Sequence, residues 1–197
     1  MSPLTILVIA SAMSAYLIWG YQATRKNLKP GEGPSFPSLL LWSVIDVIMW
    51  VNTYRAHNDQ TLIATYTILT VALTLILVFM RRFGWSKTDT FVAVIAFTCL
   101  IVSYLTSPFV GVVCGSLSIA SAGIPNLIRI SKSSPTNLLY LTIFFFFVGP
   151  LVSCISVFLN SGGMKDYVYP VVAIAYWGVA FFIALYAHAK SLKKIAM

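Results

Sequence analysis

The sequence predicts an all-α integral membrane protein with seven transmembrane helices, on three observations. Of its 197 residues, 59% are hydrophobic and only 9% are charged, whereas soluble domains carry roughly 25% charged residues. The apolar residues form runs of about twenty, the length needed to cross a bilayer. The basic residues gather in alternate loops. We therefore expect the lipid bilayer to be a partner of almost the whole chain.

The seven predicted spans are separated by loops that carry polar residues, glycine or proline. In chain order the loops contain KPGEGPSFP, RAHNDQ, RRFGWSK, SP, SKSSP and NSGGMKD, and only the first is long. Short loops leave little room for a soluble domain. The predicted spans, defined to within a few residues, are 3–23, 37–54, 61–80, 88–106, 109–130, 135–159 and 167–189.

The basic residues predict the orientation of the chain. Seven spans place the N-terminus on the side that holds only Arg55 and Lys165 of the thirteen basic residues. By the positive-inside rule the N-terminus lies outside and the C-terminus in the cytoplasm, in a multi-pass protein of the plasma (inner) membrane. This topology explains the net charge of +8 without a nucleic-acid partner. The other eleven are Arg25, Lys26, Lys29, Arg81, Arg82, Lys87, Arg129, Lys132, Lys190, Lys193 and Lys194.

An internal repeat links the first span to the fifth. LVIASAMSAYLI at residues 7–18 and LSIASAGIPNLI at residues 117–128 are identical at seven of twelve positions. PSLLLW at residues 37–42 then matches PTNLLY at residues 135–140 in a proline, two leucines and an aromatic residue. Chance similarity between small and aliphatic residues of membrane helices is the alternative explanation.

The repeat predicts two parallel three-helix bundles joined by a linker helix. The first bundle covers residues 1–82, the linker helix 83–107, and the second bundle with a short basic tail 108–197. One intervening helix makes the two triplets run in the same direction. Parallel repeats are related by an axis along the membrane normal and enclose a site near mid-membrane.

At this point the sequence resembles the SWEET and PQ-loop transporters. Pro125-Asn126 stands where those proteins carry a Pro-Gln pair, and Arg129, Ser133-Ser134 and Pro135 follow as a basic residue and a Ser-Pro helix start. In the first repeat Ala15-Tyr16 occupies the Pro-Gln position. The third and seventh spans lack the asparagine that SWEET sugar carriers direct at their substrate.

The resemblance implies a membrane transporter that moves a small polar solute, such as a sugar, an amino acid or a vitamin-like compound, by alternating access. KDEL receptors share this architecture, so a non-transporting receptor for a small ligand or peptide is the alternative. An enzyme is not expected, because the chain lacks a nucleophile elbow, an HExxH motif and a phosphate-binding glycine loop. No cofactor or metal site is predicted. The sequence leaves the oligomeric state open, a homo-oligomer included.

Asp46 is the residue most indicative of a site. It lies about nine residues into its span, which is about 14 Å at 1.5 Å per residue, while the other carboxylates lie at loops or span ends. A carboxylate at that depth is costly and normally faces the bundle interior. We expect Asp46 to bind substrate and to couple transport to protons; a structural, hydrogen-bonded Asp46 is the alternative. Trp42 and Trp50 lie one turn on either side of it.

Four further residues are predicted to bind substrate. Thr70 belongs to a threonine stripe on the third span, Asn126 is costly to bury, and Tyr176 and Trp177 lie in the middle of the seventh span. Together with Asp46 and Trp50 they form the predicted substrate site. Small hydroxyls such as that of Thr70 also serve helix packing, which is the alternative reading for it.

Two prolines are candidate hinges. Pro125 and Pro150 each remove a backbone hydrogen bond from a membrane helix. Such breaks line protein or a water cavity. Bending at these positions would let the second bundle open to either side of the membrane, and a static kink that improves packing is the alternative.

The charge asymmetry makes a topological prediction. In intact cells a tag at the C-terminus should be protected from external protease, and a tag before Pro3 should be accessible. Eleven basic residues against two fix this direction, so cleavage of the C-terminal tag alone would contradict it.

Overall fold

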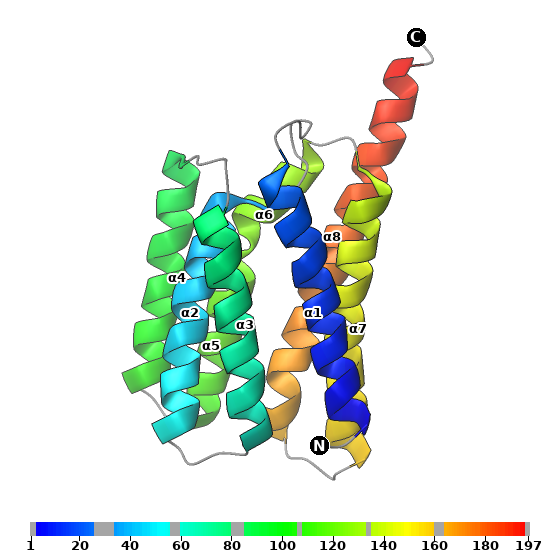
Figure 1. The fold of residues 1–197 in the computed structure, drawn as a ribbon. Helices are drawn as coiled ribbons and strands as arrows, with labels where there is room; N and C mark the ends of the chain where they lie inside the picture. The colour runs from blue at the N-terminus through cyan, green and yellow to red at the C-terminus, as the bar shows by residue number, and fades with distance from the viewer. Residues whose placement is uncertain are drawn as a thin grey trace.

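The structure is a computed structural model that describes residues 3–25, 34–55, 60–79, 85–105, 108–132, 135–159 and 164–195. These residues form helices joined by short connections and contain no strand, as Figure 1 shows. The all-helical prediction is therefore confirmed for them. The helices are α1 Pro3–Thr24, α2 Phe36–Arg55, α3 Gln60–Phe79, α4 Lys87–Leu105, α5 Pro108–Ala122, α6 Ile124–Ser131, α7 Asn137–Leu159 and α8 Met164–Ile195.

The predicted fifth span is divided into α5 and α6, so one continuous helix was the wrong expectation there. The division falls at Gly123, and Pro125 lies in the first turn of α6. Proline cannot continue a helix from the preceding turn, because it lacks an N–H and its ring meets the carbonyl four residues earlier, but it is suited to a first turn. The N–H groups of Asn126 and Leu127 both donate to the Gly123 carbonyl, at 3.0 and 3.1 Å, and start the new segment.

Pro150, in contrast, lies inside α7 without ending it. Its missing N–H leaves the carbonyl four residues earlier without a helical donor. Two hydroxyl groups bond to carbonyls near the proline: that of Ser11 in α1 donates to the Phe145 carbonyl, and that of Ser153 to the Gly149 carbonyl at 3.0 Å. The Ser11 bond also joins α1 to α7.

The last helix extends beyond its predicted end. α8 continues to Ile195, whereas the apolar run predicted an end at residue 189. The added turns contain lysine residues, which favour the C-terminal end of a helix because they complement its dipole. Figure 1 shows these turns projecting beyond the other helices.

We call α1, α2 and α3 the first group and α5, α6, α7 and α8 the second group, by their order in the chain. α3 packs against both α1 and α2, and α8 packs against α7 and against the α5–α6 pair. Within the described residues the backbones of α1 and α2 stay apart, and so do those of α7 and α5. Across the groups α1 packs on α7 and α2 packs on α5. α4 lies at one side of the molecule, mainly against α5, where the Ser118 hydroxyl donates to the Ala96 carbonyl at 2.7 Å.

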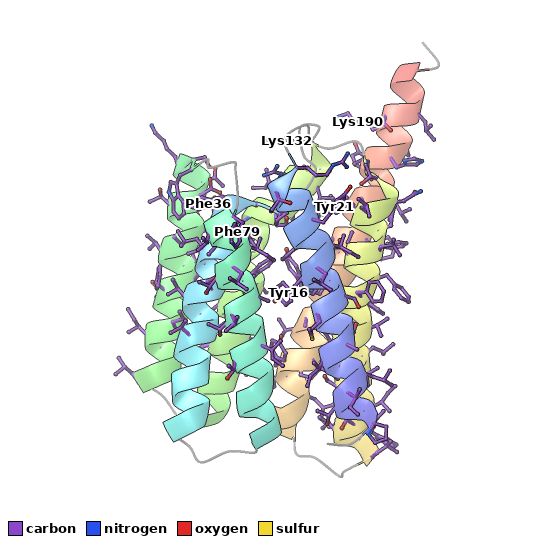
Figure 2. All side chains as sticks on the ribbon, in the orientation of Figure 1. Tyr16, Tyr21, Phe36, Phe79, Lys132 and Lys190 are labelled. Atoms are coloured by element: carbon purple, nitrogen blue, oxygen red, sulfur yellow. The ribbon has the colours of Figure 1, made fainter. Side chains whose placement is uncertain are left out.

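The outer surface of the helices is apolar. Leu17, Phe91 and Phe158 are 71%, 66% and 74% exposed, and Figure 2 shows side chains projecting outward along the helices. Large exposed apolar surfaces are rare on soluble monomers. By length and composition, four helical stretches of the described residues can cross a membrane, and two shorter helical stretches are also apolar. The four are Pro3–Thr24, Val113–Ser131, Asn137–Leu159 and Tyr167–Leu192, and the shorter two are Phe36–Val47 and Thr70–Phe79.

The Ser11 bond gives a prediction about stability. Ser11→Ala removes a hydrogen bond between α1 and α7, and interhelical bonds of this kind contribute about 0.6–1.7 kcal/mol in membranes. We expect the free energy of unfolding in bicelles to fall by about that amount. The matched control is Ser14→Ala on the same helix, because the exposed Ser14 hydroxyl bonds only to the Ala10 carbonyl one turn away, at 2.8 Å. Equal effects of the two substitutions would contradict the prediction.

Candidate functional site

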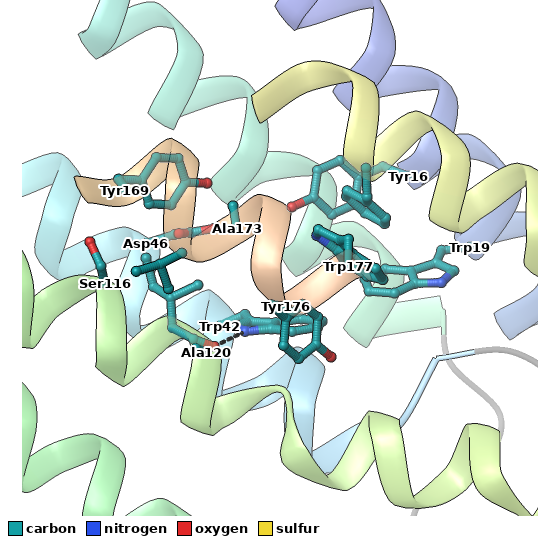
Figure 3. Close-up of a pocket in the computed structure, with 13 residues that line it drawn as sticks. Tyr16, Trp19, Trp42, Asp46, Ser116, Ala120, Tyr169, Ala173, Tyr176 and Trp177 are labelled. Carbon is teal, nitrogen blue, oxygen red and sulfur yellow. Dashed lines mark hydrogen bonds between the residues drawn. The ribbon is translucent and has the colours of Figure 1, made fainter. Parts of the chain in front are cut away.

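A cavity of about 70 Å³ lies where the two groups of helices meet. We call it the central cavity (Figure 3). Since one water needs about 10–15 Å³ on this measure, it has space for a small group of atoms. Five helices contribute: Tyr16 and Trp19 from α1, Trp42 and Asp46 from α2, Ser116, Ile119 and Ala120 from α5, Phe146 from α7, and Tyr169, Val172, Ala173, Tyr176 and Trp177 from α8.

Helical periodicity explains why these residues share the cavity. Tyr16 and Trp19 are three residues apart, Trp42 and Asp46 are four apart, and Tyr169 and Tyr176 are two turns apart. Residues three or four apart lie on the same face of a helix. Each of α1, α2 and α8 therefore presents one continuous stripe to the cavity.

Stacked aromatic rings form much of the cavity wall. Trp19 stacks on Trp42 with ring centroids 5.5 Å apart, and Phe146 stacks on Trp177 at 4.4 Å. Trp19 also contacts Phe146 at 4.6 Å, and so connects the two pairs. Stacked and tilted pairs add about 0.5–1.5 kcal/mol each beyond the area that they bury. These contacts join α1, α2, α7 and α8, so the wall is held in place by both groups of helices.

The polar edges of two rings are bonded to the backbone. The indole N–H of Trp42 donates to the Ile119 carbonyl at 2.8 Å, which Figure 3 marks with a dashed line. The hydroxyl of Tyr176 donates to the Gly123 carbonyl at 3.0 Å. The Trp42 N–H and the Tyr176 hydroxyl are therefore directed at carbonyls of the α5–α6 segment and not at a ligand.

Asp46 is the acidic member of the lining. It is 8% exposed, and the residues that the structure shows around the cavity include no lysine, arginine or histidine. Tyr16, Tyr169 and Ser116 share the lining with it. In Figure 3 the hydroxyl groups of Tyr16 and Tyr169 point toward one another on one side of the cavity, and Ser116 lies on α5. A negative charge here would meet hydroxyl groups and ring systems.

The joint between α5 and α6 is fixed by contacts to α8, to α2 and to the segment just before α2. The Tyr176 hydroxyl of α8 donates to the Gly123 carbonyl. The Asn126 N–H donates to the Ser38 hydroxyl of α2 at 3.1 Å. Arg129 Nη1 donates to the Pro34 carbonyl, just before α2, at 3.2 Å. We call this set of contacts the α6 latch.

A second, larger cavity of about 450 Å³ lies on the other side of the latch. We call it the α6 groove. Pro125 and Arg129 of α6 line it together with the starts of α2 and α4. Its carboxylate, Asp89, caps α4: it accepts bonds of 2.6 Å from the N–H and the hydroxyl of Ser86. Asp89 therefore has a structural role as part of the N-terminal cap of α4. The α6 latch thus stands between the central cavity and the groove.

The structure brings three of the predicted substrate residues together and leaves others apart. Asp46, Tyr176 and Trp177 line the central cavity. Asn126 does not line it, and its N–H donates to the Ser38 hydroxyl at 3.1 Å. Thr70 is also not a lining residue, because α3 packs against α1 and α2 without reaching the cavity. Trp50 belongs to α2, and its side chain lies outside the described residues.

Several lining residues were missed from the sequence. Tyr16 carried a signal, since it is the repeat counterpart of Asn126, and Trp19 follows it on the same face. Phe146 stands in a run of four phenylalanines at residues 144–147, which covers every face of a helical turn. In the structure Phe144 is 57% exposed while Phe146 is 9% exposed, and a uniform run gives no sign of which ring faces inward.

Comparison with protein-family models, with curated proteins and with solved structures finds no match for this chain. Its function is therefore inferred from the cavity, the helix packing and the residues themselves. The resemblance to SWEET and PQ-loop transporters remains an expectation from the sequence.

The α6 latch makes a prediction about Gly123. A β-carbon at this position would overlap the ring of Tyr176, and overpacking of this kind typically costs about 1–3 kcal/mol. We expect Gly123→Ala to lower the thermal unfolding temperature of the purified protein. The control is Gly178→Ala in α8, where a β-carbon meets no atom within 4 Å and alanine favours the helix by up to about 1 kcal/mol. A Gly123→Ala protein as stable as the control would show that Tyr176 does not need this space.

Proposed function

We propose that this protein is a seven-helix membrane transporter that moves a small polar solute by alternating access, with Asp46 coupling transport to protons. The observation that carries the proposal is the central cavity. It is enclosed by helices of both groups and contains a buried carboxyl group without a basic residue in its described lining. A purely structural aspartate would not need a cavity beside it.

The packing of the helices supports two parallel repeats, 1–82 and 108–197, joined by α4. The repeat pairs α1 with α5–α6, α2 with α7, and α3 with α8. In each group the third helix lies between the other two. A two-fold rotation that exchanges the groups also converts the α1–α7 contact into the α5–α2 contact, and both contacts are present. Parallel repeats with a site at their interface are a common plan of transporters.

The proposed orientation follows from charge. Lys132 and Lys190 lie at the same end of the molecule (Figure 2), the end to which eleven of the thirteen basic residues are assigned. This end would face the cytoplasm of a cell whose plasma membrane holds the protein. The α6 groove then opens toward the cytoplasm, and the α6 latch closes the cytoplasmic route to the central cavity.

The proposed mechanism is a rearrangement of α6. Release of the Tyr176–Gly123 bond would join the central cavity to the α6 groove, while the opposite ends of the helices close. Pro125 and Pro150 are the proposed hinges, because neither contributes the backbone bond that would resist bending. The α5–α6 segment already has its break at Gly123. Closing of one gate as the other opens is the property that distinguishes a carrier from a channel.

Asp46 is suited to proton coupling by its surroundings. An ionised carboxyl group in a site of low dielectric is unfavourable unless it meets a positive charge. A proton supplies that charge in one state of the cycle. The protein would then change conformation readily only when the charge of Asp46 is neutralised, which ties movement of the solute to movement of protons.

Asp46→Asn tests the coupling because it keeps the shape of the side chain and removes its titration. Proteoliposomes containing a pH-sensitive dye should report proton movement when a solute from a panel of sugars, amino acids, vitamins and amines is added. We expect at least one solute to move protons with the wild type, and none to do so with Asp46→Asn. Asp59→Asn, which alters a carboxylate outside the predicted spans, should leave the signal intact. Proton movement that survives Asp46→Asn would exclude Asp46 as the coupling site.

A further inference from the structure

We propose that the central cavity binds an organic cation, an amine or quaternary ammonium group, with Asp46 as its counter-ion and aromatic ring faces as its walls. This inference rests on the proposed function, because it names the class of solute that the same cavity would carry. Three features of the cavity support it: its rings, its hydrogen-bonding groups and its charge.

The first feature is the share of aromatic residues. Seven of the thirteen lining residues are aromatic, and they come from α1, α2, α7 and α8. The π-electrons of tryptophan and tyrosine attract a cation within about 6 Å of the ring centre, by about 2 kcal/mol or more where water is excluded. Rings that surround a small space from several helices are the arrangement that holds ammonium groups.

The second feature disfavours a sugar. A sugar needs a donor or acceptor for each of several hydroxyl groups, because an unpaired polar group in a dry site costs about 1–3 kcal/mol. The indole N–H of Trp42 and the hydroxyl of Tyr176 already donate to backbone carbonyls. The other polar groups of the lining are Asp46, the Ser116 hydroxyl, the hydroxyls of Tyr16 and Tyr169, and the indole N–H groups of Trp19 and Trp177. Most of these belong to aromatic side chains, whose faces form much of the wall.

The third feature is the sign of the charge. The described lining holds one carboxyl group and no basic side chain. A zwitterionic amino acid would place its own carboxylate in the cavity with no positive partner, and an anion would face Asp46 directly. Either arrangement leaves a buried charge unpaired, which is strongly unfavourable. A solute that carries a positive charge and no negative charge would pair with Asp46 and leave no buried charge unpaired.

The size of the cavity restricts the cationic group. A space of about 70 Å³ fits a compact ammonium group, and a longer substituent needs the cavity to extend past the α6 latch. That latch is where Tyr176, a lining residue, meets Gly123. The proposed ligand therefore has a small cationic head, with any larger part directed toward α6.

Charge balance gives the direction of coupling. One carboxyl group can be neutralised by a proton or by the cation, but not by both, so binding of a monovalent cation releases one proton from Asp46. The titratable groups that face Asp46 from the neighbouring helices are the phenols of Tyr16, Tyr169 and Tyr176, while α5 and α7 contribute none to the lining. Cation and proton should therefore be exchanged across the membrane in opposite directions.

Binding can be tested with a matched pair of probes. Choline and 3,3-dimethylbutan-1-ol have the same shape and differ in the charge of one atom, and tetramethylammonium serves as a second cation. Titration of the full-length protein in nanodiscs, followed by calorimetry and by tryptophan fluorescence from Trp19, Trp42 and Trp177, gives the affinities. We expect choline to bind at least tenfold more tightly than its neutral analogue, and its affinity to fall as the pH is lowered. Asp46→Asn should weaken choline binding at least tenfold and abolish the difference between the pair, while Asp59→Asn, which alters a carboxylate outside the predicted spans, should change neither.

The outcomes separate this inference from the proposed function. Equal binding of choline and its neutral analogue, no binding of either cation, or an unchanged affinity in Asp46→Asn would overturn the cation site. If choline binds selectively but neither choline nor protons cross proteoliposome membranes, the cation site stands and transport is wrong. If a neutral solute moves protons while no cation binds, transport stands and the cation site is wrong.

Discussion

The constraint on which the rest of this structure depends is that a backbone carbonyl inside a membrane must find a donor within the protein. The regular series of helical hydrogen bonds is interrupted where α5 ends and α6 begins. There the Gly123 carbonyl accepts a hydrogen bond from the Tyr176 hydroxyl in addition to backbone hydrogen bonds. The break therefore fixes the position of Tyr176. Tyr176 also lines the central cavity. The same side chain therefore supplies a hydrogen-bond donor at the helix break and forms part of the cavity wall.

The same constraint decides the character of the cavity. Trp42 and Tyr176 direct their polar edges at carbonyls of α5 and the joint, and their faces are left to the interior. Asp46, four residues beyond Trp42, lies among aromatic rings and hydroxyl groups. A carboxyl group that is poor in hydrogen bonds and rich in aromatic neighbours differs in kind from one at a helix cap, such as Asp89, whose partners are an N–H and a hydroxyl.

Much of the fold could be predicted from the sequence, because the length of an apolar run and the residues that interrupt it are local properties. The depth of Asp46 and its alignment with Trp42 were local in the same sense, and both residues line the cavity. The division at Gly123 was missed because a proline signals either a kink or a new start, and the contact with Tyr176 decides which. The position of Thr70 depends on tertiary packing, because α3 does not reach the cavity, whereas α8 supplies five lining residues.

Because α8 is long, a small tilt of this helix at the α6 latch would move its far end by a larger distance. From Tyr176 to Ile195 the helix runs for nineteen residues, about 28 Å at 1.5 Å per residue, and its last turns project beyond the neighbouring helices. A tilt of about 5° around Tyr176 would move the far end by about 2.5 Å at that length. The projecting turns of α8 would therefore amplify small movements at the latch, and a force applied to them would be transmitted back to the Tyr176–Gly123 bond.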